Sequence, residues 1–173
     1  GISPDRPRLY HKIVGDGSDE RRLWLAARCL AAVRTEEGAW EELRASLEDR
    51  RSLAIFHVIC GLVYETLGDF HEAMREFREA MNADGAYSRT YYELGVMYRQ
   101  MGQPQHAISA FREVIALEPT FADAYNQLGI AYYEAGDADR ALLVFSTARE
   151  LDPENPHHHY NTGLLLNELQ RHE

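Results

Sequence analysis

The sequence predicts an all-α fold in which antiparallel helix pairs stack on one another. One plan recurs with a period of 34 residues between residues 54 and 155. Within each period, small and large apolar residues recur at spacings of three, four and seven, which places them on one helical face. A glycine interrupts each period halfway, as expected where a turn joins two helices. A fixed period of this length is typical of stacked helical hairpins.

The clearest unit covers residues 122–155. Gly136 divides its apolar pattern into two helices. Pro153 closes the unit, because proline lacks a backbone N–H and disfavours helix at the residue before it. The residues that mark the plan are Tyr125, Leu128, Gly129, Tyr132, Gly136, Ala141, Phe145, Ala148 and Pro153.

Two units of the same plan precede it, at residues 88–121 and 54–87. In the nearer unit the same positions hold Tyr91, Leu94, Gly95, Tyr98, Gly102, Ala107, Phe111, Val114 and Pro119. In the other they hold His57, Cys60, Gly61, Tyr64, Gly68, Ala73, Phe77 and Ala80, with Gly85 in place of the proline. Three consecutive units with matching spacing make the pattern specific.

This signature, an aromatic residue, Leu-Gly, Tyr, then Ala, Phe and Pro, resembles that of the tetratricopeptide repeat family across residues 54–155. The resemblance implies a right-handed superhelical array of antiparallel helix pairs, a tetratricopeptide α-solenoid, with about nine helices in this chain. It implies an architecture and a style of binding, but it does not name a partner.

Two sets of glycines have different expected roles. The first set lies in the middle of the first helices, at Gly61, Gly95 and Gly129. Glycine costs about 1 kcal/mol of helix stability relative to alanine there. The family resemblance implies that this cost is accepted because the missing side chain lets the paired helix, with its alanine, approach closely. Those alanines are Ala73, Ala107 and Ala141. The second set ends the first helices in a left-handed conformation, at Gly68, Gly102 and Gly136.

The flanks of the three units carry separate predictions. Residues 1–19 form a lead-in over the first helices or, alternatively, a docking segment for another molecule or for the protein's own groove. Residues 20–53 form a degenerate helical-hairpin repeat, in which Trp24 and Trp40 cap the core rather than build a ligand cage. Residues 156–173 supply the first helix of a further or capping repeat.

The charge of the chain is distributed unevenly. The net charge is −10, and it arises in residues 54–173, which hold eight basic and eighteen acidic side chains. An acidic array repels phosphate backbones, so we expect no nucleic-acid partner. The acidity indicates either a solvated outer face or an acidic docking surface. No apolar run approaches the length of a membrane span, so we expect no membrane insertion.

The two cysteines, Cys29 and Cys60, do not indicate a disulfide or a metal site, because they lack a CxxC spacing or a second pair. Cys60 takes the position of Leu94 and Leu128, so we expect it to be buried. This usage favours a reducing, cytoplasmic compartment. The chain begins with Gly1 rather than methionine, so we expect a processed chain, and a removed signal peptide stays open as an alternative.

The most conspicuous cluster of chemical groups is His157, His158 and His159. Successive helical residues point about 100° apart, so three adjacent imidazoles do not meet one metal ion. His159 takes the aromatic position of Tyr125, which predicts a packing role. The sequence has no phosphate loop, nucleophile elbow or HExxH motif. We therefore expect no enzyme, no cofactor and no metal.

The family resemblance implies that the first helices line a concave groove where ligands bind. The groove is expected to expose Val58, Leu62, Arg89, Tyr92, Val96, Arg99, Asn126, Ile130, Tyr133 and Tyr160. Further residues along it are Glu65, Asp123, His157, Leu164 and Asn167. Asn126 is expected to bond a ligand backbone. The alternative is that these side chains only pack between neighbouring helices.

The leading functional prediction is a non-catalytic protein–protein interaction module that binds a peptide or protein segment in this groove. Some co-chaperones of the family clamp a peptide's terminal carboxylate with Lys, Asn and Arg. The corresponding positions here are Val58, Leu62 and Val96, so binding of chaperone tails is disfavoured. The alternatives are a structural scaffold that self-associates through its ends, or the regulatory repeat region of a larger enzyme.

Overall fold

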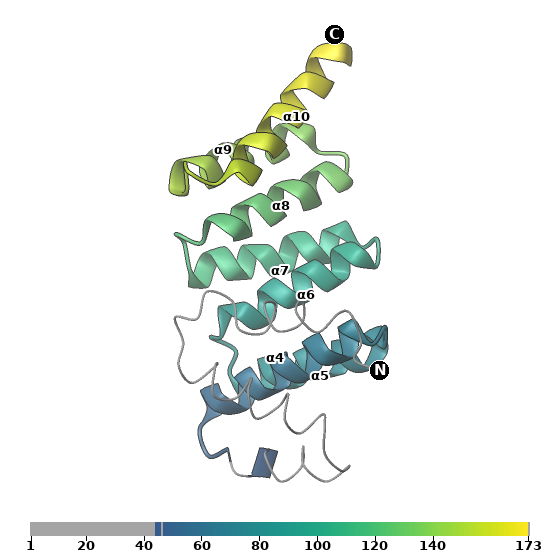
Figure 1. Cartoon of the computed structure of the whole chain (residues 1–173), viewed down its shortest axis with the longest axis vertical. Helices are drawn as coiled ribbons and strands as arrows, with labels where there is room; N and C mark the ends of the chain where they lie inside the picture. The colour runs from purple at the N-terminus through teal and green to yellow at the C-terminus, as the bar shows by residue number, and fades with distance from the viewer. Residues whose placement is uncertain (1–43, 46, 173) are drawn as a thin grey trace, which may run out of the picture. The chain divides into compact units, whose positions relative to one another are not determined.

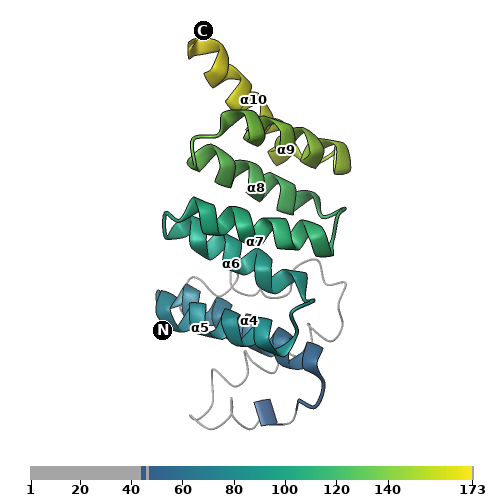
Figure 2. The ribbon, with the colours of Figure 1, turned by 180° about the vertical axis from the view of Figure 1, so that it is seen from behind.

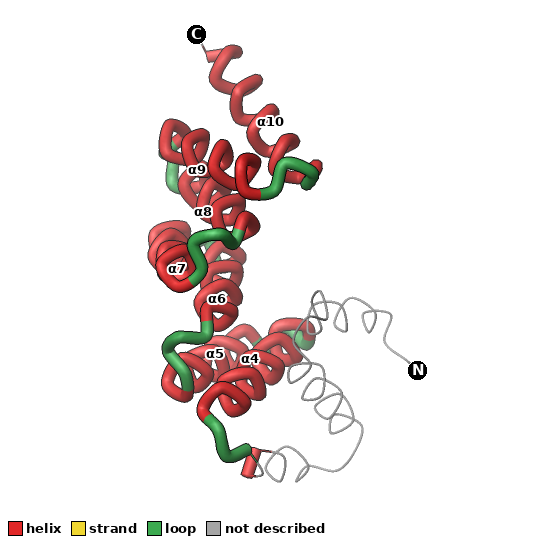
Figure 3. Tube along the Cα trace, turned by 90° about the vertical axis from the view of Figure 1, so that its left-hand side faces the viewer, coloured by secondary structure: helices red, strands yellow, loops and turns green. Residues whose placement is uncertain are grey.

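The described part of the chain is helical throughout. The structure, a computed structural model, describes residues 44–45 and 47–172. Its helices are α4 (Arg50–Thr66), α5 (Phe70–Ala83), α6 (Ser88–Gln100), α7 (Pro104–Leu117), α8 (Ala122–Glu134), α9 (Ala138–Leu151) and α10 (Pro156–His172) (Figure 1). No strand occurs among these residues (Figure 3). None of these helices combines the length and apolar character needed to cross a membrane.

The chain divides into two compact units, one ending at Thr90 and the other beginning at Tyr91. Each is described by itself below. The expected lead-in, the capping role of Trp24 and Trp40, and Cys29 all fall outside the described residues.

In the first unit, α4 and α5 form a helical hairpin whose beginnings are set by aspartates. The side chain of Asp49 accepts a hydrogen bond from the Ser52 N–H (2.8 Å) at the start of α4. Asp69 accepts from the N–H of Glu72 (3.2 Å) at the start of α5. Both bonds satisfy donors that a helix leaves unpaired in its first turn. The predicted burial of Cys60 is confirmed, because only 6% of its surface is exposed.

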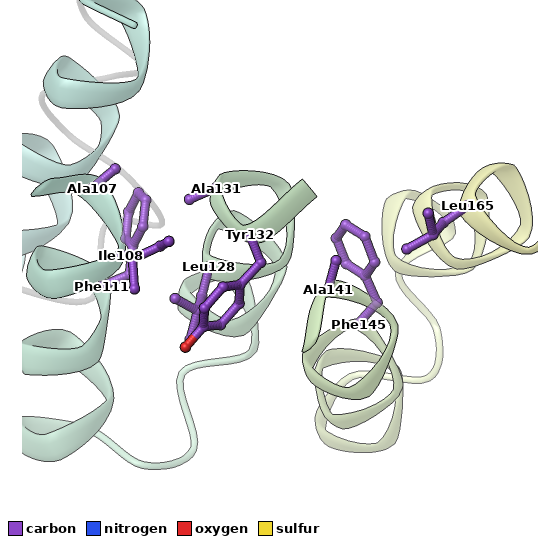
Figure 4. Close-up of a cluster of buried hydrophobic side chains, with 9 residues drawn as sticks. All are labelled: Ala107, Ile108, Phe111, Leu128, Ala131, Tyr132, Ala141, Phe145 and Leu165. Carbon is purple, nitrogen blue, oxygen red and sulfur yellow. The ribbon is translucent and has the colours of Figure 1, made fainter. Parts of the chain in front are cut away.

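The second unit continues the pattern with α7, α8, α9 and α10 packed in succession (Figures 1 and 2). Its core lies between these helices, and Figure 4 shows the side chains that fill it. They are Ala107, Ile108, Phe111, Leu128, Ala131, Tyr132, Ala141, Phe145 and Leu165. Most of them mark the 34-residue plan, so the apolar face read from the sequence is the face that becomes buried.

The glycines that end the first helices adopt the predicted left-handed conformation. Gly68, Gly102 and Gly136 have φ angles of 81°, 67° and 82°. In each turn the N–H of the following residue donates to a carbonyl of the helix, as from Asp137 to Tyr132 over 2.9 Å. This bond satisfies a carbonyl that the helix end leaves without a partner.

The glycines in the middle of the first helices let the paired helix approach closely, as expected, and the nearest group of that helix is a phenylalanine ring rather than the alanine. A Cβ atom added to Gly129 would lie 2.5 Å from a ring carbon of Phe145. Gly61 and Gly95 face Phe77 and Phe111 in the same way, at 2.5 and 2.6 Å. The ring therefore fills the space that a side chain at the glycine would occupy.

Candidate functional site

The expected groove residues divide between the two units. Val58 and Leu62 belong to the first unit and are only 1% and 0% exposed, so they offer no surface to a ligand. Arg89 also belongs to the first unit and is half-buried. The candidate site is therefore confined to the second unit. Its members from the expected list are Tyr92, Val96, Arg99, Asn126, Ile130, Tyr133 and Tyr160.

These seven residues come from α6, α8 and α10, the first helices of successive pairs, and we call them the first-helix face. Tyr160 and Tyr133 are the most exposed of them, at 66% and 46%. Asn126 is buried, with 7% of its surface exposed. The other members are half-buried.

Arg99 joins α6 to α8 with its guanidinium. Its Nε and Nη2 atoms donate to the two carboxylate oxygens of Glu134, at 3.0 and 2.6 Å. Its Nη1 donates to the side-chain oxygen of Gln127 at 2.6 Å. This two-pronged geometry is the strongest way for an arginine to hold a carboxylate. Arg99 was expected to face a ligand, but its guanidinium is engaged with Glu134 and Gln127 within the protein.

Two hydrogen bonds join α8 to α10 in a similar way. Asn161 donates its Nδ2–H to the Oδ1 of Asn126 at 2.8 Å. The hydroxyl of Tyr133 donates to Glu168 Oε2 at 2.6 Å. Both pairs are separated by 35 residues, as Arg99 and Glu134 are. The first helices are therefore connected side by side by a repeated polar seam.

The bond between Tyr133 and Glu168 affects the ionisation of the tyrosine. That hydrogen bond first, and then the negative charge of Glu168, raise the pKa of Tyr133 above its usual value. The phenol of Tyr133 therefore remains a neutral hydrogen-bond donor.

Tyr92 has a packing role on the first-helix face. Its ring stacks on Phe121 with centroids 5.3 Å apart, and it meets Phe111 edge-on at 5.9 Å. Both arrangements are favourable for aromatic pairs. The ring of Tyr92 thus holds α6 against the neighbouring helix and loop.

A cleft of about 270 Å³ opens beside this seam, between α8 and α10. It is lined by Ile130, Tyr133, Glu134, Phe145, Asn161, Leu164, Leu165 and Glu168. The aliphatic and aromatic side chains form its apolar surface, and the two glutamates and the asparagine supply its polar groups. Such a combination of apolar walls and a few polar groups is typical of binding sites.

The cleft follows directly from helix geometry. On α10, Asn161, Leu164, Leu165 and Glu168 are spaced by three, four and seven, so they share one face. Phe145 of α9 lies beneath Gly129 and faces Leu165 of α10 (Figure 4).

Sequence reasoning found part of this cleft. It placed Ile130, Tyr133 and Leu164 along the groove. The lining residues that it missed are Glu134, Phe145, Asn161, Leu165 and Glu168. Glu134 and Glu168 stand 34 residues apart, so they hold equivalent positions of two successive repeats, whereas the earlier repeats have Gln100 and Thr66 there.

Among the three adjacent histidines, His159 was expected to pack in an aromatic position, but its side chain is exposed and makes a hydrogen-bonding contact instead. Its Nε2 lies 2.7 Å from the carbonyl oxygen of Pro153. Tyr125, at the equivalent position, donates its hydroxyl to the carbonyl of Pro119 at 3.1 Å. Both side chains thus join a first helix to the end of the preceding 34-residue repeat.

His158 is fully buried, and its neighbours are acidic. Its Nε2 lies 3.7 Å from Asp123 Oδ1 and 4.0 Å from Asp152 Oδ2. Neither ring nitrogen has a hydrogen-bond partner within residues 47–172. No group of three histidine, cysteine or acidic side chains in the described part of the chain could hold a metal ion.

Comparison with known sequences identifies the repeats. Two sequence profiles of the family described as Tetratricopeptide repeat match residues 58–87 and 98–161. Together the two matches cover more than half of the chain. Among curated proteins, no sequence match is found.

The chain is also similar to solved structures. The first tetratricopeptide domain of Spaghetti (RPAP3), bound to the HSP90 peptide SRMEEVD, aligns with a TM-score of 0.66 and 19% identity over 72% of this chain and 97% of that chain. The second such domain of human RPAP3, in complex with the HSP70 peptide SGPTIEEVD, aligns with a TM-score of 0.59 and 19% identity over 65% of this chain and 97% of that chain. Pseudomonas aeruginosa pilF aligns with a TM-score of 0.68 and 19% identity over 90% of this chain and 72% of that chain. The α-solenoid fold class is confirmed.

Proposed function

Because the chain belongs to the tetratricopeptide repeat family, we propose that it is a non-catalytic module that binds a peptide or protein segment on its first-helix face. The cleft between α8 and α10 carries this proposal. It combines apolar walls with polar groups on the same helices that present Tyr133 and Tyr160. Two similar structures hold peptides, from HSP90 and HSP70, which supports a peptide ligand as a class.

The chemistry of the cleft suits an anchoring side chain rather than a reacting group. Ile130, Leu164 and Leu165 offer aliphatic surface, and burying such surface drives association. Tyr133 and Tyr160 add rigid aromatic contacts, which are common at the centres of protein interfaces. Since Arg99 and Asn126 are engaged in the polar seam, the apolar side chains supply the main attraction.

The test compares capture of a partner by the intact chain and by two variants. Leu164→Ala removes a half-exposed side chain that lines the cleft. Leu143→Ala removes an exposed leucine of α9 that does not line it. We expect Leu164→Ala to weaken partner binding at least about fivefold, the effect of a contact worth about 1 kcal/mol. We expect Leu143→Ala to bind as the unchanged chain does.

The outcome depends on one partner, identified by capture with the unchanged chain from an extract and then titrated against each purified variant. Circular dichroism checks that both variants keep their helices. Equal affinity of the partner for the two variants would remove the cleft from the proposal.

A second candidate function is self-association, which α10 favours by its exposed apolar residues. Tyr160, Leu164 and Leu166 are 66%, 50% and 41% exposed. Large exposed apolar residues grouped on one helix are a route to contacts between copies. Light scattering over a range of concentrations decides this point: a rising molecular mass supports self-association, and a constant monomer mass excludes it.

A further inference from the structure

We propose that the cleft selects segments in which a bulky apolar residue lies close to an arginine or lysine, and that it rejects acidic segments. This inference rests on the proposed binding function and specifies the chemistry of its ligand. The apolar residue would enter between α8 and α10, and the cation would meet the carboxylate of Glu168 at the rim.

The first support is the charge of the surrounding unit. Residues 91–173 contain five basic and twelve acidic side chains. Such an excess favours the approach of cationic segments and opposes anionic ones. The unit as a whole therefore biases the partner before any contact forms.

The second support is the local balance of charge at the cleft. Two glutamates, Glu134 and Glu168, line it. Arg99 compensates Glu134 through its paired hydrogen bonds. Glu168 instead accepts a hydrogen bond from Tyr133, a neutral hydroxyl donor that brings no positive charge to the carboxylate. Glu168 is the carboxylate that a ligand cation would neutralise.

The third support is the position of the carboxylate relative to the apolar surface. Glu168 lies one helical turn beyond Leu164 and Leu165 on the same face of α10. A side chain held against the two leucines thus brings its neighbours within reach of Glu168. Arginine and lysine suit this geometry, because their long apolar stems cover hydrophobic surface while the charged ends reach the rim.

The experiment selects ligands for the whole chain from a library of short randomised peptides, and then measures the affinity of the enriched peptides. We expect these peptides to combine a bulky apolar residue with a nearby arginine or lysine. The peptides SRMEEVD and SGPTIEEVD serve as acidic probes, and we expect both to bind at least about tenfold more weakly than the enriched peptides, as for like charges at an interface.

Variants of the chain then test the two halves of the inference. Glu168→Gln keeps the size and the acceptor but removes the charge, and we expect binding about two- to fivefold weaker, the usual size of an exposed charge pair. Glu168→Lys should favour acidic peptides instead. Glu150→Gln is the matched control, because it removes an exposed charge from α9, outside the cleft. We expect this control to keep the preference for cationic peptides.

The outcomes separate this inference from the proposed function. If the enriched peptides lose affinity for Leu164→Ala but are acidic, or bind Glu168→Gln unchanged, then the charge rule is wrong and binding in the cleft stands. If they bind Leu164→Ala unchanged, or if no peptide is enriched, then the proposed function fails together with the inference.

Discussion

The first helices α4, α6 and α8 each accommodate a phenylalanine ring of the partner helix at a glycine, namely Gly61, Gly95 and Gly129. Phe77, Phe111 and Phe145 are 0%, 0% and 3% exposed. A pattern of spacings predicts that these rings face inward, but it does not give the direction of each ring. For this reason the sequence suggested alanine as the neighbour of the glycine, whereas the structure places phenylalanine there.

Gly129→Ala and Gly163→Ala form a matched pair that tests this packing. The added methyl group of Gly129→Ala would clash with Phe145, so we expect a loss of about 1–3 kcal/mol in the free energy of unfolding. At Gly163 nothing lies within 4 Å of the added atom, so the better helix former should add up to about 1 kcal/mol. Denaturant unfolding followed by circular dichroism measures both, and equal effects of the two substitutions would contradict the clash.

In the first unit, a buried histidine and glutamate form a pair whose strength depends on pH. His57 Nδ1 lies 2.7 Å from Glu76 Oε2. Burial raises the pKa of Glu76, but the hydrogen bonds and charges of His57 and Arg75 outweigh it, so this pKa lies below its usual value of 4.5. The carboxylate is therefore bound more favourably in the folded chain than in the unfolded one.

The sign of the pH dependence follows from that lowered pKa. The lowered pKa of Glu76 adds stability that is present above pH 4.5 and is lost as the pH falls through the lower pKa of the folded state. We expect the unchanged chain to lose unfolding free energy faster than Glu76→Gln below pH 4.5. Unfolding curves collected across acidic pH test this, and parallel pH profiles for the two proteins would rule out the contribution.

At the scale of the element, equivalent helices differ in how they begin. Asp137 accepts from the N–H of Arg140 at 3.0 Å and so caps α9. Gln103, at the equivalent position before α7, makes no such side-chain bond. The sequence shows this difference, because aspartate is a favoured cap and glutamine is not.

Substitutions at these two positions should have opposite effects on stability. Asp137→Ala removes a cap and should cost about 0.5–2 kcal/mol of unfolding free energy. Gln103→Asp places a capping side chain before Pro104 and should raise stability by about 0.5–1 kcal/mol. Thermal melting detects both changes. A lower melting temperature for Gln103→Asp would show that α7 begins in a way that a cap does not help.

The polar seam also belongs to the scale of elements, and the sequence did not predict it. The period is 34 residues, but the bonded pairs are separated by 35. That offset depends on the angle at which neighbouring helices pack, which spacing along the chain does not give. Without that offset, spacing along the chain indicated no partner for Asn126 within the protein, and its side chain was expected to face a ligand. In the structure its side-chain oxygen accepts a hydrogen bond from Asn161.

At the scale of the whole molecule, the sequence predicted more of the architecture than of the site. The repeat period located the buried faces and the three left-handed glycines, because both depend on local residue types. The cleft depends on which side chains of α8, α9 and α10 leave space between them. It therefore had to be read from the packed helices, and only three of its lining residues were expected beforehand.

The measurement that tests binding on the first-helix face most directly is a nuclear magnetic resonance titration of the whole chain, isotope-labelled, with an enriched peptide. We expect the amide signals that shift to belong to residues 130–134 of α8 and 161–168 of α10, the segments that line the cleft. The same titration of Leu164→Ala should require more peptide for equal shifts. Shifts confined to α7 and α9, with those two segments unchanged, would contradict the proposed site.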